Sequence, residues 1–162
     1  MVVNAIKNAL AESNYKIIEL NEQKPWGAYF RLDSTMTESF LADFFSGLTL
    51  EKARLGHKGA ELSPKILLVA PGHRLSWQYH HRRAERWAFL TGGAFYRSDG
   101  DDEGVICDAK PGDIVQFNQA ERHRLVGARE HYTIVAEIWQ HTDSDLVSDE
   151  EDIVRLDDDY GR

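Results

Sequence analysis

The sequence contains a single cysteine, Cys107, in 162 residues. A lone cysteine cannot form an intramolecular disulfide, so nothing requires an oxidising compartment, and we expect a cytoplasmic location. The chain lacks any apolar run near the roughly 18 residues that a membrane-spanning helix needs, and it lacks a signal-peptide pattern. We therefore expect neither membrane insertion nor secretion.

Excess basic charge is also absent. The formal net charge is −8, and the stretch from Asp143 to Asp159 accounts for all of it, because it holds nine acidic residues and one arginine. The other residues sum to zero and offer no net positive field to nucleic acid or anionic lipid. Nucleic acid and membranes are therefore not expected partners.

From Lys65 onward the sequence consists of short apolar runs separated by Gly, Pro and Asp. Runs of this kind are typical of β-strands, and eight of them in succession favour a jelly roll. The expected strands are residues 65–70, 75–80, 85–91, 94–97, 104–107, 113–117, 123–126 and 131–139. The sequence therefore predicts a mainly β protein.

The N-terminal third has a different pattern. Apolar residues recur near helical spacing in residues 2–12 and 38–55, so both segments are expected to form amphipathic helices. A chain of this length suits one compact domain. We expect residues 1–64 to form a helical extension with a first strand, residues 65–142 to form the barrel, and residues 143–162 to fold back on it.

Four side chains have the residue types and spacing of a metal site: Gln78, His80, Glu85 and His123. Alternate side chains of a strand share a face, so Gln78 and His80 point the same way. Glu85 follows a short polar connection and returns beside His80, and a later strand delivers His123. Two imidazoles, a carboxylate and an amide oxygen would then converge, and such donors bind divalent metals. For Gln78, a neutral amide, the alternative is a supporting contact to a ligand.

The remaining histidines lie outside this pattern. A histidine on a strand is usually a hydrogen-bonded packing or surface residue, and we keep this interpretation for four of them. These four are His57, His73, His131 and His141. His81 adjoins His80, but strand alternation turns it away, so a structural or rim position is expected.

The segments Gly72–Gly92 and Gly112–His123 resemble the two sequence motifs of cupins. Within cupins, the chain is similar to the C-terminal domain of type II mannose-6-phosphate isomerases, which are often fused to a mannose-1-phosphate guanylyltransferase. The similarity covers residues 24–34 and 65–162. The stretches that carry it are Lys24–Tyr29, Pro71–Gly72, Leu75–Gln78, Arg83–Trp87, His123–Leu125 and Asp152–Arg162.

This resemblance implies a single-domain cupin jelly-roll barrel with added helices, acting as an isomerase that interconverts mannose 6-phosphate and fructose 6-phosphate. It favours zinc at the metal site, although a mixed imidazole and carboxylate site also admits manganese, iron, cobalt or nickel. It also implies a homodimer, which would cover the exposed apolar face expected of Phe40, Phe44 and Phe45.

The chain departs from the family pattern at several positions. Asn118 and Ala120 replace a usual proline and glycine in the second motif. Gly127 replaces a frequent asparagine, and Arg82 stands where a third histidine is common. The metal ligands survive these changes, so the metal is better supported than the substrate. No Gly-rich phosphate loop opens a helix, and nucleotide-sugar synthesis is therefore not expected.

Isomerisation of an aldose to a ketose needs a group that moves a proton between adjacent carbons. Glu137 shares a strand face with Val135 and Trp139, and on an inward face it would be a buried carboxylate beside the metal. Glu85 is a rival base, and Arg124 would reach the site only if its strand had ended. Burial would raise the pKa of Glu137 whereas a nearby cation would lower it, and the sequence leaves this balance open.

Four residues are candidate ligands of the sugar phosphate: Lys65, Arg155, Tyr160 and Arg162. Guanidinium groups match phosphate oxygens with paired donors, but the alternative for both arginines is pairing with the surrounding aspartates. Apolar residues alternate with the acidic residues in 152–162, so this segment is expected to pack on the barrel. Its removal is expected to leave the metal content nearly unchanged. For residues 143–151 the alternative is a solvated run of charge.

Two other classes of protein fit the same residues. His80, Glu85 and His123 are also the two histidines and one carboxylate of non-haem iron oxygenases, although Gln78 as a fourth ligand argues against that class. A cupin that binds a sugar without turnover is the other alternative, which the altered second motif would permit. Activity assays with and without metal separate the three classes.

Overall fold

The computed structural model describes residues 1–162 as a barrel of two antiparallel sheets. The six-stranded sheet consists of β1 Ile17–Lys24, β2 Gly27–Leu32, β3 Lys65–Val69, β5 Arg83–Phe89, β8 Ile114–Phe117 and β10 Thr133–His141. The five-stranded sheet consists of β4 Trp77–Tyr79, β6 Gly93–Ser98, β7 Ile106–Ala109, β9 Arg122–Gly127 and β11 Val154–Asp157. The helices are α1 Val2–Glu12, α2 Thr37–Phe44 and α3 Leu50–Ala53, with a 3-10 turn at Ser34–Met36.

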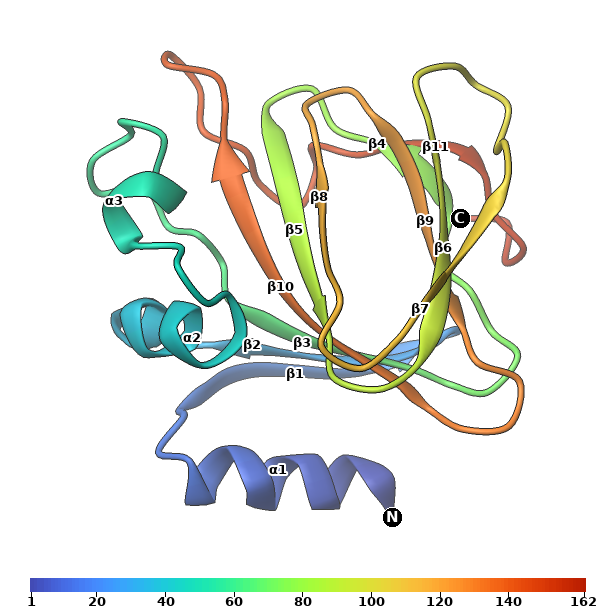
Figure 1. The fold of residues 1–162 in the computed structure, drawn as a ribbon, viewed down its shortest axis with the longest axis horizontal. Helices are drawn as coiled ribbons and strands as arrows, with labels where there is room; N and C mark the ends of the chain where they lie inside the picture. The colour runs from blue at the N-terminus through green and yellow to red at the C-terminus, as the bar shows by residue number, and fades with distance from the viewer.

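The two sheets face each other and the helices lie outside the barrel (Figure 1). The strand orders are β1-β2-β3-β10-β5-β8 and β11-β4-β9-β6-β7. From β3 onward the chain crosses between the sheets at almost every step, which is the connectivity of a jelly roll. All eight strands expected from residue 65 onward are present, and their ends differ from the expectation by at most two residues. The prediction of a mainly β jelly roll is therefore confirmed.

Side-chain alternation along β3 divides the apolar residues into two cores. Ile66 and Leu68 belong to a cluster with residues of α1 and α2, which cover the outer face of the six-stranded sheet. Leu67 and Val69 belong to a second cluster between the sheets. Both faces of this strand are buried, so β3 reads as a continuous apolar run instead of an alternating one.

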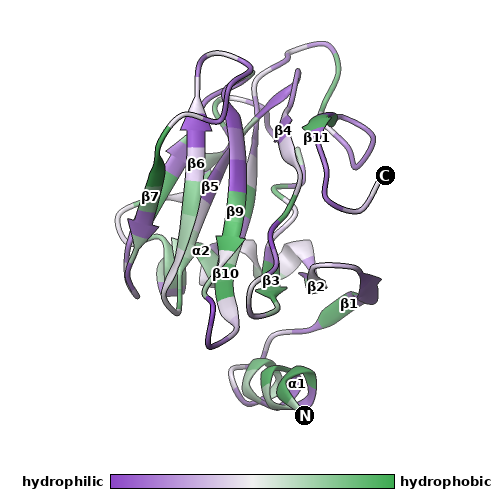
Figure 2. Ribbon diagram, turned by 90° about the vertical axis from the view of Figure 1, so that its right-hand side faces the viewer, coloured by the Kyte–Doolittle hydropathy of each residue, from purple (hydrophilic) through white to green (hydrophobic).

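The polarity of the barrel changes along its strands (Figure 2). In β9, Arg122, His123 and Arg124 come first, and Leu125 and Val126 follow. Leu125 packs in the core between the sheets. The strand therefore places polar side chains at one end of the barrel and apolar side chains at the other.

The single helix expected over residues 38–55 is wrong. The chain forms α2 and α3 instead, separated by a turn at Gly47, whose φ of +83° is a left-handed conformation. Phe40 and Phe45 are buried in the chain's own core, at 0% and 1% exposed, and Phe44 packs against it. The exposed phenylalanine face that favoured a homodimer is therefore absent, and the homodimer stays a prediction without this support.

The C-terminal segment lies against the barrel. β11 pairs with β4, and Arg155 lies opposite Gln78. Ser148 and Asp152, in the acidic stretch that precedes β11, are 6% and 4% exposed. The acidic stretch is therefore not a uniformly solvated run of charge, because part of it is built into the fold.

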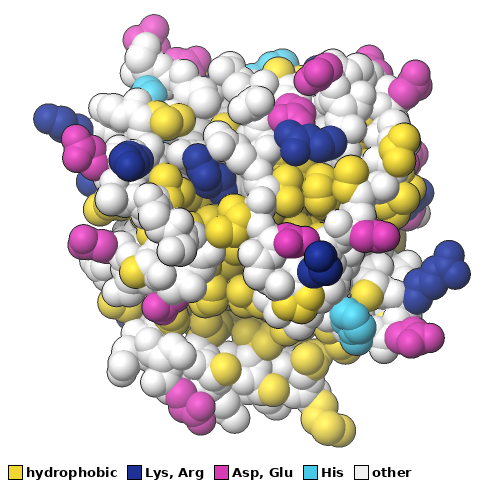
Figure 3. All heavy atoms as spheres, in the orientation of Figure 1, with side chains coloured by type: hydrophobic (Ala, Val, Ile, Leu, Met, Phe, Trp, Pro, Cys, Tyr) yellow, Lys and Arg dark blue, Asp and Glu magenta, His cyan; other side chains and the backbone are white.

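No helix of the chain has both the length and the apolar character to cross a lipid bilayer. On the face drawn in Figure 3, acidic and basic side chains are intermixed. An extended basic patch, which proteins that bind nucleic acid commonly present, is not seen on this face.

Candidate metal centre

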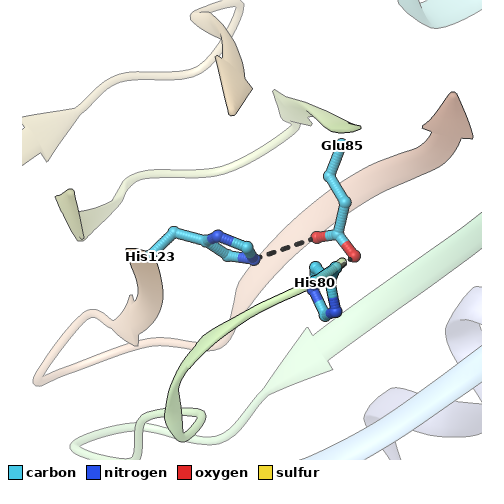
Figure 4. A group of neighbouring side chains, drawn as sticks. All are labelled: His80, Glu85 and His123. Atoms are coloured by element: carbon cyan, nitrogen blue, oxygen red, sulfur yellow. Dashed lines mark ion pairs between the residues drawn. The ribbon is translucent and has the colours of Figure 1, made fainter. Parts of the chain in front are cut away.

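Two sheets bring His80, Glu85 and His123 together inside the barrel (Figure 4). His80 follows β4, Glu85 lies in β5 and His123 lies in β9. Nε2 of His80 is 3.0 Å from Oε1 of Glu85, and Nε2 of His123 is 3.3 Å from Oε2 of the same carboxylate. One donor atom from each residue lies within 4.8 Å of the others, and all three residues are at most 2% exposed. The structure thus brings three of the four expected ligands within reach of one cation.

Backbone carbonyls fix both imidazole rings. Nδ1 of His80 donates to the carbonyl oxygen of Asp152 at 2.6 Å, and Nδ1 of His123 donates to that of Glu121 at 2.9 Å. With the proton on Nδ1, each Nε2 presents a lone pair toward Glu85. This is the tautomer that a metal-binding imidazole needs, and hydrogen bonds of this kind are typical behind metal ligands.

Two atoms of this group are buried without a hydrogen-bond partner: Oε2 of Glu85 and Nε2 of His123. An unpaired buried polar group costs about 1–3 kcal/mol, and lone pairs that face one another repel. A divalent cation among these atoms would satisfy them together. The residues present therefore fit a metal ion, while their donor types leave its identity undetermined.

Gln78 is placed differently from the other three expected ligands. It lies in β4 opposite His123 and lines the same cavity as Glu85. Its Oε1 accepts a hydrogen bond from Oγ of Ser76 at 2.6 Å. The amide oxygen is neutral and one of its two lone pairs is occupied, so we expect Gln78 to contribute less to holding a cation than the histidines and Glu85.

Arg83 adjoins the ligands, although its position in the sequence did not single it out. Its Nε donates to Oε1 of Glu85 at 2.9 Å, and one terminal nitrogen lies 3.4 Å from Nε2 of His80. The guanidinium carbon lies 3.9 Å from the ring centre of Trp139. Arg83 precedes Glu85 by two residues in β5, so both side chains share a face. That period-two relation is the signal that could have identified it.

Burial and charge set the protonation of the ligands. Burial lowers the pKa of His80, and the positive charge of Arg83 lowers it further, against the opposing attraction of Glu85. Burial alone would raise the pKa of Glu85, but the attraction of His80 and Arg83 outweighs it and holds the pKa well below its ordinary value. A neutral imidazole and an ionised carboxylate are the forms that bind a metal.

A cavity of about 230 Å³ adjoins Glu85 and Gln78. Its walls include several of the residues expected to take part in catalysis or substrate binding. These are Lys65, Glu137, Arg155 and Arg162. The structure therefore collects residues from β3, β5, β10 and the C-terminal segment around one space.

Glu137 lies in β10 between Lys65 of β3 and Trp87 of β5. Its Oε2 accepts a hydrogen bond from Nε1 of Trp87 at 3.1 Å, and the residue is 7% exposed. Burial raises the pKa of Glu137 to about 7, and the charge of Glu85 adds to this effect against Lys65 and Arg83. In the protein without a metal, the effect of burial on Glu137 thus outweighs that of the nearby basic residues, and its pKa is raised.

The three basic candidates differ in how they are paired. Nζ of Lys65 lies 2.6 Å from Oε1 of Glu150, and Arg162 bonds to Asp158 at 2.9 Å. Arg155 lines the cavity and forms no ion pair. Of the three, Arg155 is therefore the most available to an anionic ligand.

Arg124 and Tyr160 do not line this cavity. Alternation along β9 turns Arg124 away from the ligands, and its buried guanidinium is paired with Glu103 and Asp157. Tyr160 packs against the core between the sheets, and Arg162 lies over its ring. Their positions give no support to the catalytic role expected for Arg124 or to the substrate contact expected for Tyr160.

The other histidines do not join the metal centre. His141 is buried, and its ring bonds to two backbone groups. His73 and His131 are exposed and bond to nearby carbonyls, and His57 joins no group of metal-binding residues. His81 packs edge-on against the neighbouring tyrosine ring.

The turn that leads to His123 contains two departures from the cupin pattern. Ala120 has a φ of +62°, a left-handed conformation that glycine adopts without steric cost. Its N–H donates to the carbonyl oxygen of His80 at 2.9 Å. The N–H of Asn118 donates to Oε2 of Glu121 at 2.8 Å. The turn therefore keeps a glycine-like backbone without the glycine and links the segments that carry both histidine ligands.

Residues 54–158 match the family model described as mannose-6-phosphate isomerase C-terminal. The chain belongs to this family. The matched span contains Gln78, His80, Glu85 and His123, together with Glu137 and Arg155. The resemblance drawn from the sequence motifs is therefore confirmed.

One curated relative and two solved structures are similar to this chain. The alginate biosynthesis protein AlgA of Pseudomonas aeruginosa is 30% identical over 145 residues, which cover 86% of this chain and 22% of AlgA. The chain thus spans less than a quarter of that relative. The capsular polysaccharide assembling protein CapF of Staphylococcus aureus superposes with a TM-score of 0.58 at 10% identity, covering 86% of this chain and 34% of CapF. A Cupin 2 conserved barrel domain protein from Salinispora arenicola CNS-205 gives a TM-score of 0.44 at 21% identity, covering 55% and 69%.

Removing a histidine ligand should release the metal. His80→Ala and His123→Ala each leave two of the three convergent donors, whereas Gln78→Ala should only weaken binding because that oxygen has its own partner. The zinc that each variant retains after dialysis, measured by mass spectrometry, tests whether the histidine variants lose more metal than Gln78→Ala. His131→Ala, an exposed histidine, is the matched control and should retain the parent level. Parent-level zinc in both ligand variants would show that the assignment is wrong.

The raised pKa of Glu137 predicts a pH-dependent stability in the metal-free protein. The folded state keeps this proton up to about pH 7, whereas an ordinary glutamate releases it near 4.5. The folded chain therefore binds more protons between these values, and this stabilisation, complete below pH 4.5, is lost as the pH rises to 7. A shift of this size corresponds to on the order of 3 kcal/mol.

Glu137→Gln should remove this component, because the amide does not ionise and still offers Trp87 an oxygen acceptor. In urea unfolding, the variant should gain stability relative to the parent as the pH rises from about 4.5 to 7. Zinc should shrink the difference, since a nearby cation lowers the pKa of a carboxyl group. Parallel pH profiles of the two metal-free proteins would contradict the prediction.

Proposed function

We propose that the protein is a metal-dependent aldose–ketose isomerase and that it interconverts mannose 6-phosphate and fructose 6-phosphate. The observation that carries the proposal is a single cavity lined by Glu85 of the metal-binding group, by a carboxyl group of raised pKa and by several basic side chains. Membership of the mannose-6-phosphate isomerase C-terminal family supports the choice of sugar.

The charge of the cavity suits an anionic substrate. Five basic and three acidic residues line it, although the whole chain carries a net charge of −8. The basic residues are Lys24, Lys65, Arg83, Arg155 and Arg162. Lys65, Arg83 and Arg162 already bond to carboxylates, and Lys24 offers an ammonium group without the paired donors of a guanidinium. Arg155 is therefore the group best placed to meet phosphate oxygens with paired donors. The small volume favours a compact polar molecule over a drug-sized ligand, whose pockets span about 300–1,000 Å³.

Isomerisation moves a proton from C2 of mannose 6-phosphate to C1 and a hydroxyl proton from O2 to O1, so the atoms balance without an oxidant. Glu137 is the proposed base, because it is a buried carboxyl group on the wall of the cavity that Glu85 also lines, and burial raises its pKa above the ordinary value in the metal-free protein. A divalent ion held by His80, Glu85 and His123 would supply Lewis-acid polarisation of the reacting oxygens. Arg83 keeps Glu85 ionised and fixed in the ligand position.

The iron oxygenase alternative gains one argument from the geometry. Oε1 of Gln78 accepts a hydrogen bond from Ser76. The remaining three residues, His80, Glu85 and His123, are a set of two histidines and one carboxylate. A cupin that binds a sugar without turnover would use the same cavity. Product analysis and oxygen uptake separate these classes from the isomerase.

The reaction itself can be followed in deuterated water. The zinc-loaded protein should convert mannose 6-phosphate into fructose 6-phosphate that carries deuterium at C1, the carbon next to the carbonyl, and NMR spectroscopy detects the label. Glu137→Gln should slow turnover by about 100-fold or more, as expected for loss of a general base. Oxygen uptake with ferrous iron and substrate would select the oxygenase, and no isomerisation of any hexose or pentose phosphate would favour the binding cupin.

Arg155→Ala tests the phosphate contact separately. Loss of a charge-assisted hydrogen bond to phosphate should raise the KM for mannose 6-phosphate by roughly 10-fold or more, with a smaller effect on kcat. Arg129→Ala removes an exposed arginine that does not line the cavity and is the matched control. Equal KM values for Arg155→Ala and the control would exclude Arg155 from substrate binding.

A further inference from the structure

A short part of the acidic stretch, residues 148–152, lies directly behind the metal centre. Its two ends, Ser148 and Asp152, are 6% and 4% exposed, whereas Glu151 is exposed. Burial of an aspartate in a strongly acidic stretch needs specific partners to offset its desolvation. The contacts of Asp152 supply them.

Asp152 bonds to the ring of His80 and to the backbone of the two residues that follow His80. Its carbonyl oxygen accepts the Nδ1 proton of His80 at 2.6 Å. Its carboxylate accepts the N–H of His81 at 2.9 Å, the N–H of Arg82 at 3.0 Å and the hydroxyl of Ser148 at 2.6 Å. The carboxylate therefore clamps the segment to the loop that carries a metal ligand.

The same segment also holds Arg83. A terminal nitrogen of Arg83 donates to Oγ of Ser148 at 2.8 Å, to the carbonyl oxygen of Asp149 at 2.9 Å and to that of Asp152 at 3.3 Å. The Nε of this guanidinium bonds to Glu85. Two of the three metal-binding side chains thus have their partners fixed by one segment distant in sequence.

We propose that Asp152 is a positioning residue of the metal centre and that residues 148–152 form a strap coupling the C-terminal segment to metal binding. The carboxylate fixes the strap, and the strap carbonyl then fixes the tautomer and direction of the His80 ring. Metal bound at His80 stabilises the strap in return, because linkage is reciprocal. Such a strap opposes the expectation that residues 152–162 can be removed without affecting the metal.

Asp152→Asn is the decisive substitution. The carboxylate accepts from three donors, and an amide offers one oxygen while its NH₂ group would face a donor. Loss of the clamp should weaken zinc and cobalt binding by about 10- to 100-fold, the range found when groups behind metal ligands are changed. Glu151→Gln makes the same charge change at the adjacent exposed position and should stay within about 2-fold of the parent, since exposed acids contribute little.

The readout is metal affinity, not turnover. Competition with a chromophoric chelator gives the dissociation constant, and the absorption spectrum of bound cobalt reports the ligand geometry. Hydrogen exchange at the amides of His81 and Arg82 adds a second signature. These amides should exchange more slowly when zinc is added to the parent and faster in Asp152→Asn.

The outcomes separate this inference from the proposed isomerase. If the parent binds neither zinc nor cobalt, the metal centre and the strap both fail. If the parent binds metal and Asp152→Asn matches it in affinity and cobalt spectrum, the strap alone is overturned. Should Asp152→Asn not fold, Ser148→Ala, which removes one hydroxyl from the clamp, decides instead: a several-fold weaker affinity supports the strap, and an unchanged affinity overturns it.

Discussion

The burial of one ionised carboxylate, Glu85, governs the organisation of this protein around its metal centre. A charged group at this depth is stable only where opposite charge and hydrogen bonds replace water. Arg83 supplies part of that charge through its Nε, while the two imidazoles turn lone pairs toward the same carboxylate because backbone carbonyls hold their protons. Oε2 of Glu85 and Nε2 of His123 are left without partners. The constraint therefore calls for a second cation, and the donor set is the one that divalent metals prefer.

The fold satisfies this constraint by drawing on both sheets at once. Glu85 and Glu137 come from neighbouring strands of the six-stranded sheet, whereas His123 and the segment carrying His80 belong to the five-stranded sheet. His80 and Glu85 lie on neighbouring segments, whereas His123 is distant from both in the sequence and meets them only when the two sheets face each other. The two carboxylates then differ in state although they share one cavity. Glu85 bonds to Arg83 and stays ionised. Glu137 bonds to an indole and forms no ion pair with Arg83, so in the metal-free protein it keeps its proton to about pH 7.

The sequence predicted the structure correctly where the two-residue alternation of side chains along a strand determined their positions. Alternation along a strand, together with ligand types and spacing, located His80, Glu85 and His123, and the Gly, Pro and Asp turns located eight strands. The same period would have found Arg83 two residues before Glu85. The helix over residues 38–55 failed because apolar spacing does not register a left-handed turn at Gly47. The role of Asp152 behind His80 could not be predicted from the sequence. Its partners around His80 lie 70 to 72 residues away, and the residues around it have the composition of a solvated acidic stretch.

The acidic stretch illustrates how composition can conceal structure. Its carboxylates pair with basic residues of the barrel and of the segment itself. The pairs are Lys65–Glu150, Arg124–Asp157, Arg162–Asp158 and Arg74–Asp159. Arg155, in the same segment, has no such partner and is held opposite Gln78 by the β11–β4 pairing. One strand pairing therefore places the backbone of Arg155 directly beside that of Gln78. The proposed anion contact comes from β11 and the proposed base from β10, which belong to different sheets. This arrangement suits the proposed hexose 6-phosphate, because its phosphate lies at the opposite end of the sugar from C1 and C2.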